Sequence, residues 1–225
     1  MYKVNFLAHN WLLMKNANDK FSEALRRFKG VVYDLGCGPR PHEHDVLRVA
    51  DKYVGVDWEH TLHGWHADVA ADLNEPLPMA DEVADTIMSL SVLEHLREPQ
   101  NMLDEAYRLL RPGGMIFIAV PFQWWVHEAP YDYFRFTRYG LEYMLTKAGF
   151  TEIDVRENSG FWLMWVAKFN CQTLKLIRGP RVVQWIIRAC LFPIWLGDQL
   201  LALLLDRHWH APGETQGYNV TAFKR

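Results

Sequence analysis

Two glycines and two carboxylates in the first quarter of the chain have the types and spacing of a small-molecule binding site. Gly36 and Gly38 follow an apolar run that ends at Leu35, and glycine lets a ligand approach main-chain atoms with no Cβ in the way. Asp34 precedes them, and Asp57 follows some twenty residues later. A carboxylate at this spacing can accept hydrogen bonds from both hydroxyls of a ribose. The pattern predicts a nucleotide-like ligand; the alternative is a connecting turn and an Asp that only ends a strand.

The residues after this turn argue against a pyrophosphate site. A dinucleotide fingerprint needs a third glycine that opens a helix, whereas Pro39, Arg40 and Pro41 follow here. Cys37, between the two glycines, is interpreted as a small filler and not as a nucleophile.

Residues 121–137 carry a second group of reactive side chains in an aromatic stretch that has no clear period and is expected to be a loop. Loops at the carboxyl ends of strands carry function in α/β folds. His127 is the candidate general base for an acceptor oxygen, because unperturbed histidine titrates near working pH. An alternative of equal weight is that His127 is a structural loop histidine that is hydrogen-bonded to a neighbouring carbonyl. Asp132 and Arg135 are further catalytic candidates, with the alternative that they pair with each other and fix the loop.

Closely spaced histidines raise the question of a metal ion. The histidines concerned are His60, His63, His66, His208 and His210. The first three follow a strand end and enclose Gly64, so they are not expected to share a helix face. The three cysteines, Cys37, Cys171 and Cys190, have no metal-ligand spacing. We therefore expect no metal site.

Alternating strands and helices are expected to position these residues. Strands are predicted at 31–35, 53–57, 83–89, 115–120, 151–157 and 218–224. Helices are predicted from a cap at Asn18 or Asp19 to Gly30, over 42–50, from Pro99 to the Arg111-Pro112-Gly113-Gly114 stop, and from a Thr137 cap to Gly149. This alternation favours an α/β three-layer sandwich around a mostly parallel sheet of about seven strands, the last of them antiparallel.

Five motifs in order and register make the chain resemble the class I methyltransferases, which use S-adenosylmethionine. They are Asp34 to Gly38, Asp57, Asp72-Leu73 with Leu77-Pro78, the Glu94-His95 pair, and Arg108 to Gly114. The resemblance covers residues 30–150, with the last strand returning near residue 224. It implies a single methyltransferase domain over residues 1–225, S-adenosylmethionine as cofactor, and transfer of its methyl group. The pattern Pro-Phe…His…Pro-x-Asp-Tyr-x-Arg-x-Thr in 121–137 is similar to methyltransferases among glycan-modifying enzymes.

The resemblance implies a role for each cofactor-binding residue. Gly36, Cys37 and Gly38 form the turn at the methionine part, and Asp34 binds its amino group directly or through water. Ser89 and Leu90, at the end of the fourth strand, offer carbonyl oxygens to the same ammonium group. At the other end of the cofactor, Asp57 holds the ribose and Trp58 lies against the adenine. Asp72 accepts from the adenine amino group, with the Leu73 backbone beside it.

Composition narrows the class of partner and the compartment. A formal net charge of −3 provides no basic face for nucleic acid. An odd, sparse set of three cysteines suits a reducing cytoplasm, and residues 1–20 lack the apolar run of a signal peptide. We therefore expect a cytoplasmic protein with no nucleic-acid partner.

Residues 159–212 form an apolar, helical insertion between the last two predicted strands. A break at Gly179-Pro180 divides it, and Arg188, Pro193 and Asp198 interrupt its second half. A membrane span is not expected, because each central charge costs roughly 2.5–3.5 kcal/mol on insertion scales. Tryptophan, leucine and isoleucine with interspersed lysine and arginine suit peripheral contact with the inner membrane face. A cap on the sheet edge or a homodimer contact is the alternative.

The sequence thus predicts an enzyme that transfers a methyl group to a small-molecule or glycan-like acceptor, at oxygen, with a lipid-linked sugar as one form of acceptor. Two alternatives stay open. One is methylation of an isoprenoid lipid such as a quinone precursor. The other is a non-catalytic protein of the same fold that binds the cofactor as a scaffold or sensor.

Overall fold

The computed structural model describes residues 4–59, 66–209, 211 and 213–225, which fold as two compact units. The first unit holds residues 21–156 and 217–225, and the second holds residues 4–20 and 157–216. The second unit therefore contains the predicted insertion 159–212 together with a segment near the N-terminus.

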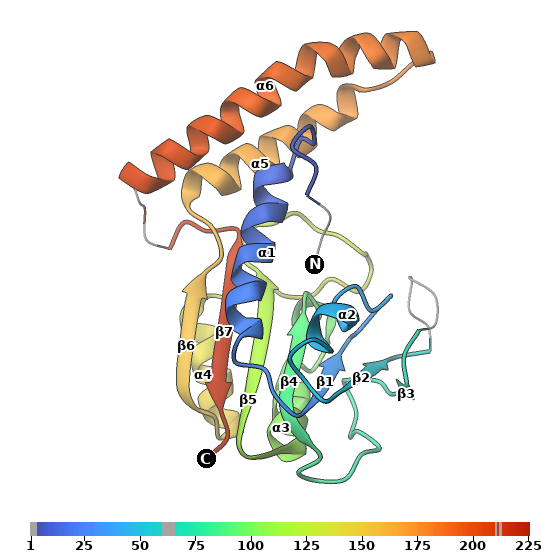
Figure 1. Cartoon of the computed structure of the whole chain (residues 1–225), viewed down its shortest axis with the longest axis vertical. Coiled ribbons are helices and arrows are strands. Elements are labelled where there is room, and N and C mark those ends of the chain that lie inside the picture. The colour runs from blue at the N-terminus through green and yellow to red at the C-terminus, as the bar shows by residue number, and fades with distance from the viewer. Residues whose placement is uncertain (1–3, 60–65, 210, 212) are drawn as a thin grey trace. The chain divides into compact units, whose positions relative to one another are not determined.

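A seven-stranded sheet forms the first unit, in the order β3-β2-β1-β4-β5-β7-β6 (Figure 1). The strands are β1 (Val31–Leu35), β2 (Lys52–Asp57), β3 (Val69–Ala70), β4 (Ala84–Leu90), β5 (Leu110–Pro121), β6 (Thr151–Glu157) and β7 (Gly217–Phe223). The central strands β2, β1, β4 and β5 are parallel neighbours, and β7 is antiparallel to β5. The predicted α/β sandwich with an antiparallel last strand is confirmed. The two-residue strand β3 was not predicted.

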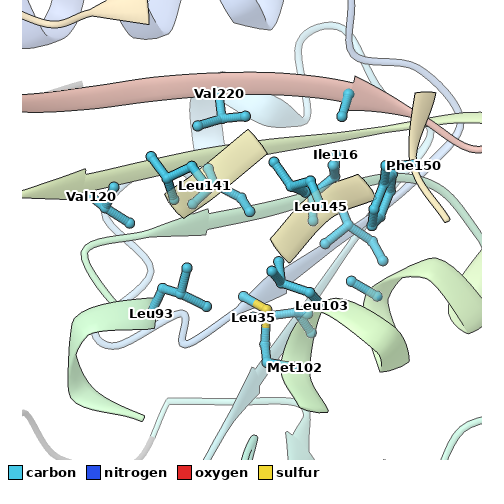
Figure 2. Packing of buried hydrophobic residues seen from close by; sticks show 14 of the residues in the cluster. Leu35, Leu93, Met102, Leu103, Ile116, Val120, Leu141, Leu145, Phe150 and Val220 are labelled. Atoms are coloured by element: carbon cyan, nitrogen blue, oxygen red, sulfur yellow. The ribbon is translucent and has the colours of Figure 1, made fainter. Parts of the chain in front are cut away.

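Helices cover both faces of this sheet. On one face, α3 (Pro99–Leu109) and α4 (Arg138–Ala148) bury Leu103, Leu141 and Leu145 against Ile116 and Val220 of the sheet (Figure 2). On the other face, the end of α1 (Trp11–Leu25) and the short α2 (Glu43–Val46) contribute to a second apolar cluster. This burial on both faces explains why the parallel strands are apolar nearly throughout.

Three predicted boundaries differ from the structure. Helix α1 begins at Trp11, well before the expected cap at Asn18 or Asp19, and Trp11, Leu12 and Leu13 are buried. Helix α2 covers four residues of the expected 42–50. Helix α3 ends at Leu109, and Arg111 to Gly114 form an irregularity inside β5, between its pairing of Leu110 with Ala84 and of Met115 with Thr86.

Helix α4 confirms both of its predicted ends. The Thr137 side chain accepts a hydrogen bond from the Gly140 N–H at 3.1 Å, which caps the first turn. Gly149 ends the helix with φ 102°, a left-handed conformation that glycine adopts without a Cβ penalty.

The second unit contains two helices in contact, α5 (Phe161–Thr173) and α6 (Arg181–His208), joined through the short η2 (Leu174–Leu176) (Figure 1). Both carboxylate oxygens of Asp206 accept from backbone N–H groups at the start of α5, those of Trp162 and Leu163, at 2.9 Å. The Trp195 indole donates to the Thr173 hydroxyl at 2.7 Å. These bonds fix α6 along α5.

Helix α6 is continuous over 28 residues, with Pro193 inside it. By length and composition alone it could cross a membrane, since an 18-residue window has a mean hydropathy of 1.5. Its buried stripe is Leu191, Trp195, Gln199 and Ala202, which are about one helical turn apart. Much of the remaining surface of α6 is exposed and apolar, including Trp185, Ile186 and Leu204.

Candidate active site

The glycine turn that follows β1 has two glycines with different requirements. Both have positive φ, 81° at Gly36 and 48° at Gly38, which favours glycine. A Cβ on Gly36 would lie 2.3 Å from a methyl group of Val92, so packing against Val92 already requires glycine there. A Cβ on Gly38 would meet no described atom within 4 Å. The open space at this turn is therefore at Gly38.

Asp57 lies beside this open space, at the carboxyl end of β2. Its Oδ2 accepts from the Gly38 N–H at 2.8 Å, and its Oδ1 accepts from the Trp58 N–H at 2.8 Å. Each carboxylate oxygen has a second lone pair, so the oriented carboxylate can still accept from two hydroxyls. The structure brings Gly38 and Asp57 together as the sequence predicts.

Asp34 lies in β1 and is almost completely buried. Its Oδ2 accepts from the Tyr53 hydroxyl at 2.5 Å. Burial raises the pKa of Asp34 to about 7, and the hydrogen bond from Tyr53 offsets part of that rise. Of the two predicted contacts with a ligand ammonium, this burial favours the water-mediated one.

Cys37 is buried, and burial followed by the nearby carboxylates of Asp34 and Asp57 raises its pKa to about 12. A thiol in this state is a poor nucleophile, in keeping with the prediction of a small filler. Its sulfur occupies the space in which a Cβ on Gly55 would lie, 2.8 Å away.

The remaining predicted cofactor residues lie at the carboxyl ends of neighbouring strands or just beyond them. Asp72 accepts through Oδ1 from the backbone and the side chain of Asn74, which shapes the turn, and the Leu73 side chain is buried in the core. The Ser89 hydroxyl donates to the Leu35 carbonyl at 2.8 Å and is fully buried, so only its backbone is available to a ligand. Leu90 ends β4.

The loop 122–137 is anchored to the same end of the sheet. The backbone carbonyl of Glu94, just past β4, accepts from the N–H groups of Tyr133 and Phe134 at 2.9 and 3.2 Å. The Tyr131 ring stands edge-on to the Trp58 ring with their centroids 5.3 Å apart. The loop therefore lies beside the ends of β2 and β4, which carry predicted cofactor residues.

Within this loop, Asp132 holds both other catalytic candidates. Its carboxylate binds the Arg135 guanidinium through two hydrogen bonds of 2.5 and 2.7 Å and accepts from the His127 N–H at 2.8 Å. Arg135 holds the pKa of Asp132 down at about 2. The predicted alternative, a loop-fixing pair of Asp132 and Arg135, thus describes their contacts. The His127 imidazole lies with Nδ1 3.3 Å from Asp132 Oδ2.

Glu94 is a candidate site residue that the sequence alone did not single out. It is completely buried in the short η1 (Leu93–His95), and no other described residue donates a hydrogen bond to either of its carboxylate oxygens. Burial raises its pKa to about 8. Its Oε1 lies 3.7 Å from His95 Nε2 and 3.9 Å from His127 Nε2. In the sequence, the Glu94-His95 pair is recognisable only as part of the methyltransferase pattern.

The structure describes only some of the closely spaced histidines that the sequence offers as metal ligands. His60, His63 and His210 lie outside the described residues. His208 is exposed in the last turn of α6.

Comparison with known proteins adds to this geometry. A methyltransferase domain family matches residues 33–118. The chain is 30% identical over 107 residues to the ubiquinone biosynthesis O-methyltransferase of Mesorhizobium japonicum, covering 43% of each protein. Among solved structures it is similar to an S-adenosylmethionine-dependent methyltransferase from Archaeoglobus fulgidus, with TM-score 0.57, 17% identity, and 95% and 94% of the two chains covered.

Residues 33–118 thus belong to a methyltransferase domain of the class I, S-adenosylmethionine-dependent type. The chain spans about two fifths of the length of ubiquinone biosynthesis O-methyltransferases that it matches. A further structural neighbour is phosphoethanolamine N-methyltransferase 2 of Haemonchus contortus in complex with S-adenosylhomocysteine, with TM-score 0.59, 15% identity, and 93% of this chain and 52% of that chain covered. At these identities the likeness of the structures shows the fold alone.

The residues of this methyltransferase fit its cofactor. The open space at Gly38, the oriented carboxylate of Asp57 beside it and the buried carboxyl of Asp34 offer the room and the acceptors that the methionine, ribose and ammonium parts of S-adenosylmethionine would need. When bound, the cofactor supplies a methyl group activated by a positively charged sulfur.

Proposed function

We propose that this chain transfers a methyl group from S-adenosylmethionine to an oxygen atom of a small-molecule or glycan-like acceptor. The observation that carries the proposal is the anchoring of loop 122–137 by the Glu94 carbonyl, because it supports a position of the loop's reactive side chains near the predicted cofactor residues. Methyl transfer is an in-line displacement whose rate depends strongly on positioning. The loop is the natural place for the acceptor.

His127 is the proposed group that acts on the acceptor proton. Its imidazole is partly exposed, while Asp132 and, behind it, Arg135 hold its backbone and its Nδ1 side. This leaves Nε2, which lies 3.9 Å from Glu94 Oε1, as the nitrogen that can take the acceptor proton, with the ring orientation fixed. His127→Ala is expected to lower turnover at least tenfold while the affinity for S-adenosylmethionine stays within about twofold.

Calorimetry with purified protein tests the cofactor half of the proposal. S-adenosylmethionine and S-adenosylhomocysteine should both bind in the micromolar range, about −8 kcal/mol. Asp57→Ala should weaken both together, because the ribose is common to them. Unchanged binding in that variant would contradict the placement of the ribose at Asp57. Binding without turnover on any acceptor pool would favour the scaffold alternative.

The related ubiquinone biosynthesis O-methyltransferases support transfer to oxygen and keep a quinone precursor as the second acceptor class. Radiolabelled methyl transfer to an extracted lipid pool and to a lipid-linked sugar pool would separate the two. Label in a phenolic prenyl lipid favours the quinone-type acceptor, and label released with the sugar by mild acid favours the glycan-type acceptor.

We further propose that the second unit makes peripheral contact with a membrane on its cytoplasmic side. Helix α6 buries one stripe, while large apolar side chains such as Trp185, Ile186 and Leu204 are exposed together with the positively charged Arg181 and Arg188. Exposed apolar area of this kind marks a contact surface, and interspersed positive charge suits anionic lipid.

Flotation with anionic liposomes tests this contact. Trp185→Ser combined with Ile186→Ser should abolish flotation, whereas Tyr139→Ser combined with Tyr143→Ser, at exposed positions on α4, should leave it unchanged. Release by high salt is expected of a peripheral contact, and resistance to alkaline carbonate would instead indicate a spanning helix. A protein that never floats but loses its dimer in the double variant would assign the surface to self-association.

A further inference from the structure

Three side chains from two separate segments converge outside the glycine turn and form a group with metal-ligand chemistry. Glu94 and His95 come from the turn after β4, and His127 comes from the loop after β5. One oxygen or nitrogen atom from each of the three lies within 4.8 Å of the others. One carboxylate and two imidazoles are a common ligand set for zinc and for other first-row divalent ions.

The two separations from the Glu94 carboxylate are close to those that a single ion requires. Two ligands about 2.1 Å from a tetrahedral ion lie about 3.4 Å apart. Glu94 Oε1 lies 3.7 Å from His95 Nε2 and 3.9 Å from His127 Nε2, so movements of a few tenths of an ångström bring each imidazole to the required distance from the carboxylate. All three pairs of ligand atoms lie within 4.8 Å of one another.

Both imidazoles are oriented in the way that metal-bound histidines usually are. His95 Nδ1 lies 2.6 Å from the Tyr131 carbonyl oxygen, and His127 Nδ1 lies 3.3 Å from Asp132 Oδ2. An oxygen acceptor at Nδ1 holds the proton on that nitrogen and leaves the lone pair of Nε2 directed at Glu94. Such outer partners fix the tautomer and the ring orientation of a histidine ligand.

Glu94 is a buried carboxyl that receives no hydrogen bond from another described residue, which independently points to a bound ligand. Its side chain is completely inaccessible, and neither oxygen receives a hydrogen bond from another described residue. A buried carboxylate without donors is costly, and native proteins pair such groups or place them on a metal ion. His95 and His127 are partly exposed, which leaves the group open on the side of the loop.

We propose that Glu94, His95 and His127 bind one divalent first-row transition-metal ion, of the kind represented by zinc. The site differs from the histidine groups that the sequence suggested and from the expectation of no metal. Three protein ligands leave further coordination positions for water or for a hydroxyl oxygen of the acceptor. That last assignment rests on the proposed function, whereas binding of the ion does not. With the ion present, His127 acts as its ligand and not as a free base.

Titration of the full-length, EDTA-treated protein with Co²⁺ tests the site through visible absorption, which reports bound ion independently of activity. The wild type should bind one equivalent with ligand-field bands, and Zn²⁺ should displace it. Glu94→Gln and His127→Gln should each weaken binding at least tenfold, and Asp132→Asn should weaken it about tenfold through the orientation of His127. His208→Gln, at an exposed histidine of α6, should bind as the wild type does.

Absence of saturable Co²⁺ binding in the wild type, or equal binding in Glu94→Gln and the wild type, would overturn the proposal. Circular dichroism of each variant shows that it is folded, and His127→Gln on the exposed side provides a second test if Glu94→Gln does not fold. Calorimetry with S-adenosylmethionine on the same EDTA-treated protein separates the two proposals. Cofactor binding without metal binding would leave the proposed function standing and remove only the ion.

Discussion

The buried carboxyl of Asp34 should make the stability of this methyltransferase depend on pH in a direction opposite to that of most carboxylates. Burial raises its pKa from 3.8 to about 7. The native state therefore holds this proton more tightly than the unfolded chain does. Stability is highest where Asp34 is protonated in both states, falls as pH rises between about 4 and 7, and is level above that window.

The size of the effect follows from the shift. About three pKa units at 1.36 kcal/mol each make ionised Asp34 cost about 4 kcal/mol at pH 8, with the Tyr53 hydrogen bond already included. About 1.6 kcal/mol of this is present at pH 5, because the unfolded chain is by then mostly ionised. Asp34→Asn removes the titration and keeps an oxygen for the Tyr53 hydroxyl. Relative to the wild type, the variant should gain about 2–3 kcal/mol of stability between pH 5 and pH 8.

Urea denaturation followed by tryptophan fluorescence at several pH values measures this difference. Comparing the variant with the wild type cancels the other titrating groups. Tyr53→Phe is the companion variant, since it removes the donor to Asp34 and should cost more at pH 8 than at pH 5. A difference between Asp34→Asn and the wild type that does not change with pH would refute a raised pKa at Asp34. Asp34→Asn should also bind S-adenosylmethionine more weakly if the ammonium is held there.

Three further variants test other parts of the structure. Gly36→Ala should cost roughly 2–4 kcal/mol of unfolding free energy through its clash with Val92, whereas Gly38→Ala should cost only about 1 kcal/mol and mainly lower cofactor affinity, as urea denaturation and calorimetry would show. Asp206→Ala should cost about 1 kcal/mol through loss of the cap on α5, with Asp206→Asn closer to the wild type in thermal melts. Arg135→Lys should speed hydrogen exchange in loop 122–137, while Arg138→Lys, at an exposed pair with Glu142, should not; equal rates would contradict the anchoring role of Arg135.

The sequence was sufficient for the sheet and for the cofactor side of the site because both depend on local signals. Alternating apolar runs and turn residues predicted six of the seven strands, and the glycines that follow β1 stand close to Asp57 only because β1 and β2 are parallel neighbours. The strand β3 was missed because two residues are too few to produce a period. The start of α1 was misplaced because Asn18 and Asp19 are ordinary cap residues, whereas buried contacts of Trp11, Leu12 and Leu13 extend the helix.

Helix α6 is continuous through Arg188, Pro193 and Asp198, the residues that interrupt its apolar run in the sequence. Pro193 lies inside the helix, and the Asp198 carboxylate accepts a hydrogen bond from the Asn170 side chain of α5 at 3.2 Å. A polar residue that pairs with a neighbouring helix does not end its own helix. Which polar residues find such partners depends on how α5 and α6 pack, and that cannot be obtained from spacing within one segment.

The acceptor side of the site depends on a contact between segments that are thirty residues apart in the chain. His127 has no neighbour in sequence that would identify its role. Nor does spacing show that Glu94 is completely buried, with its backbone carbonyl bound by the N–H groups of Tyr133 and Phe134. The loop that this contact anchors also carries His127, whose Nε2 lies 3.9 Å from Glu94 Oε1. A carboxyl removed from water in this way either keeps its proton or is compensated by a positive charge, and a bound divalent ion would provide that charge where the described side chains offer Glu94 no donor.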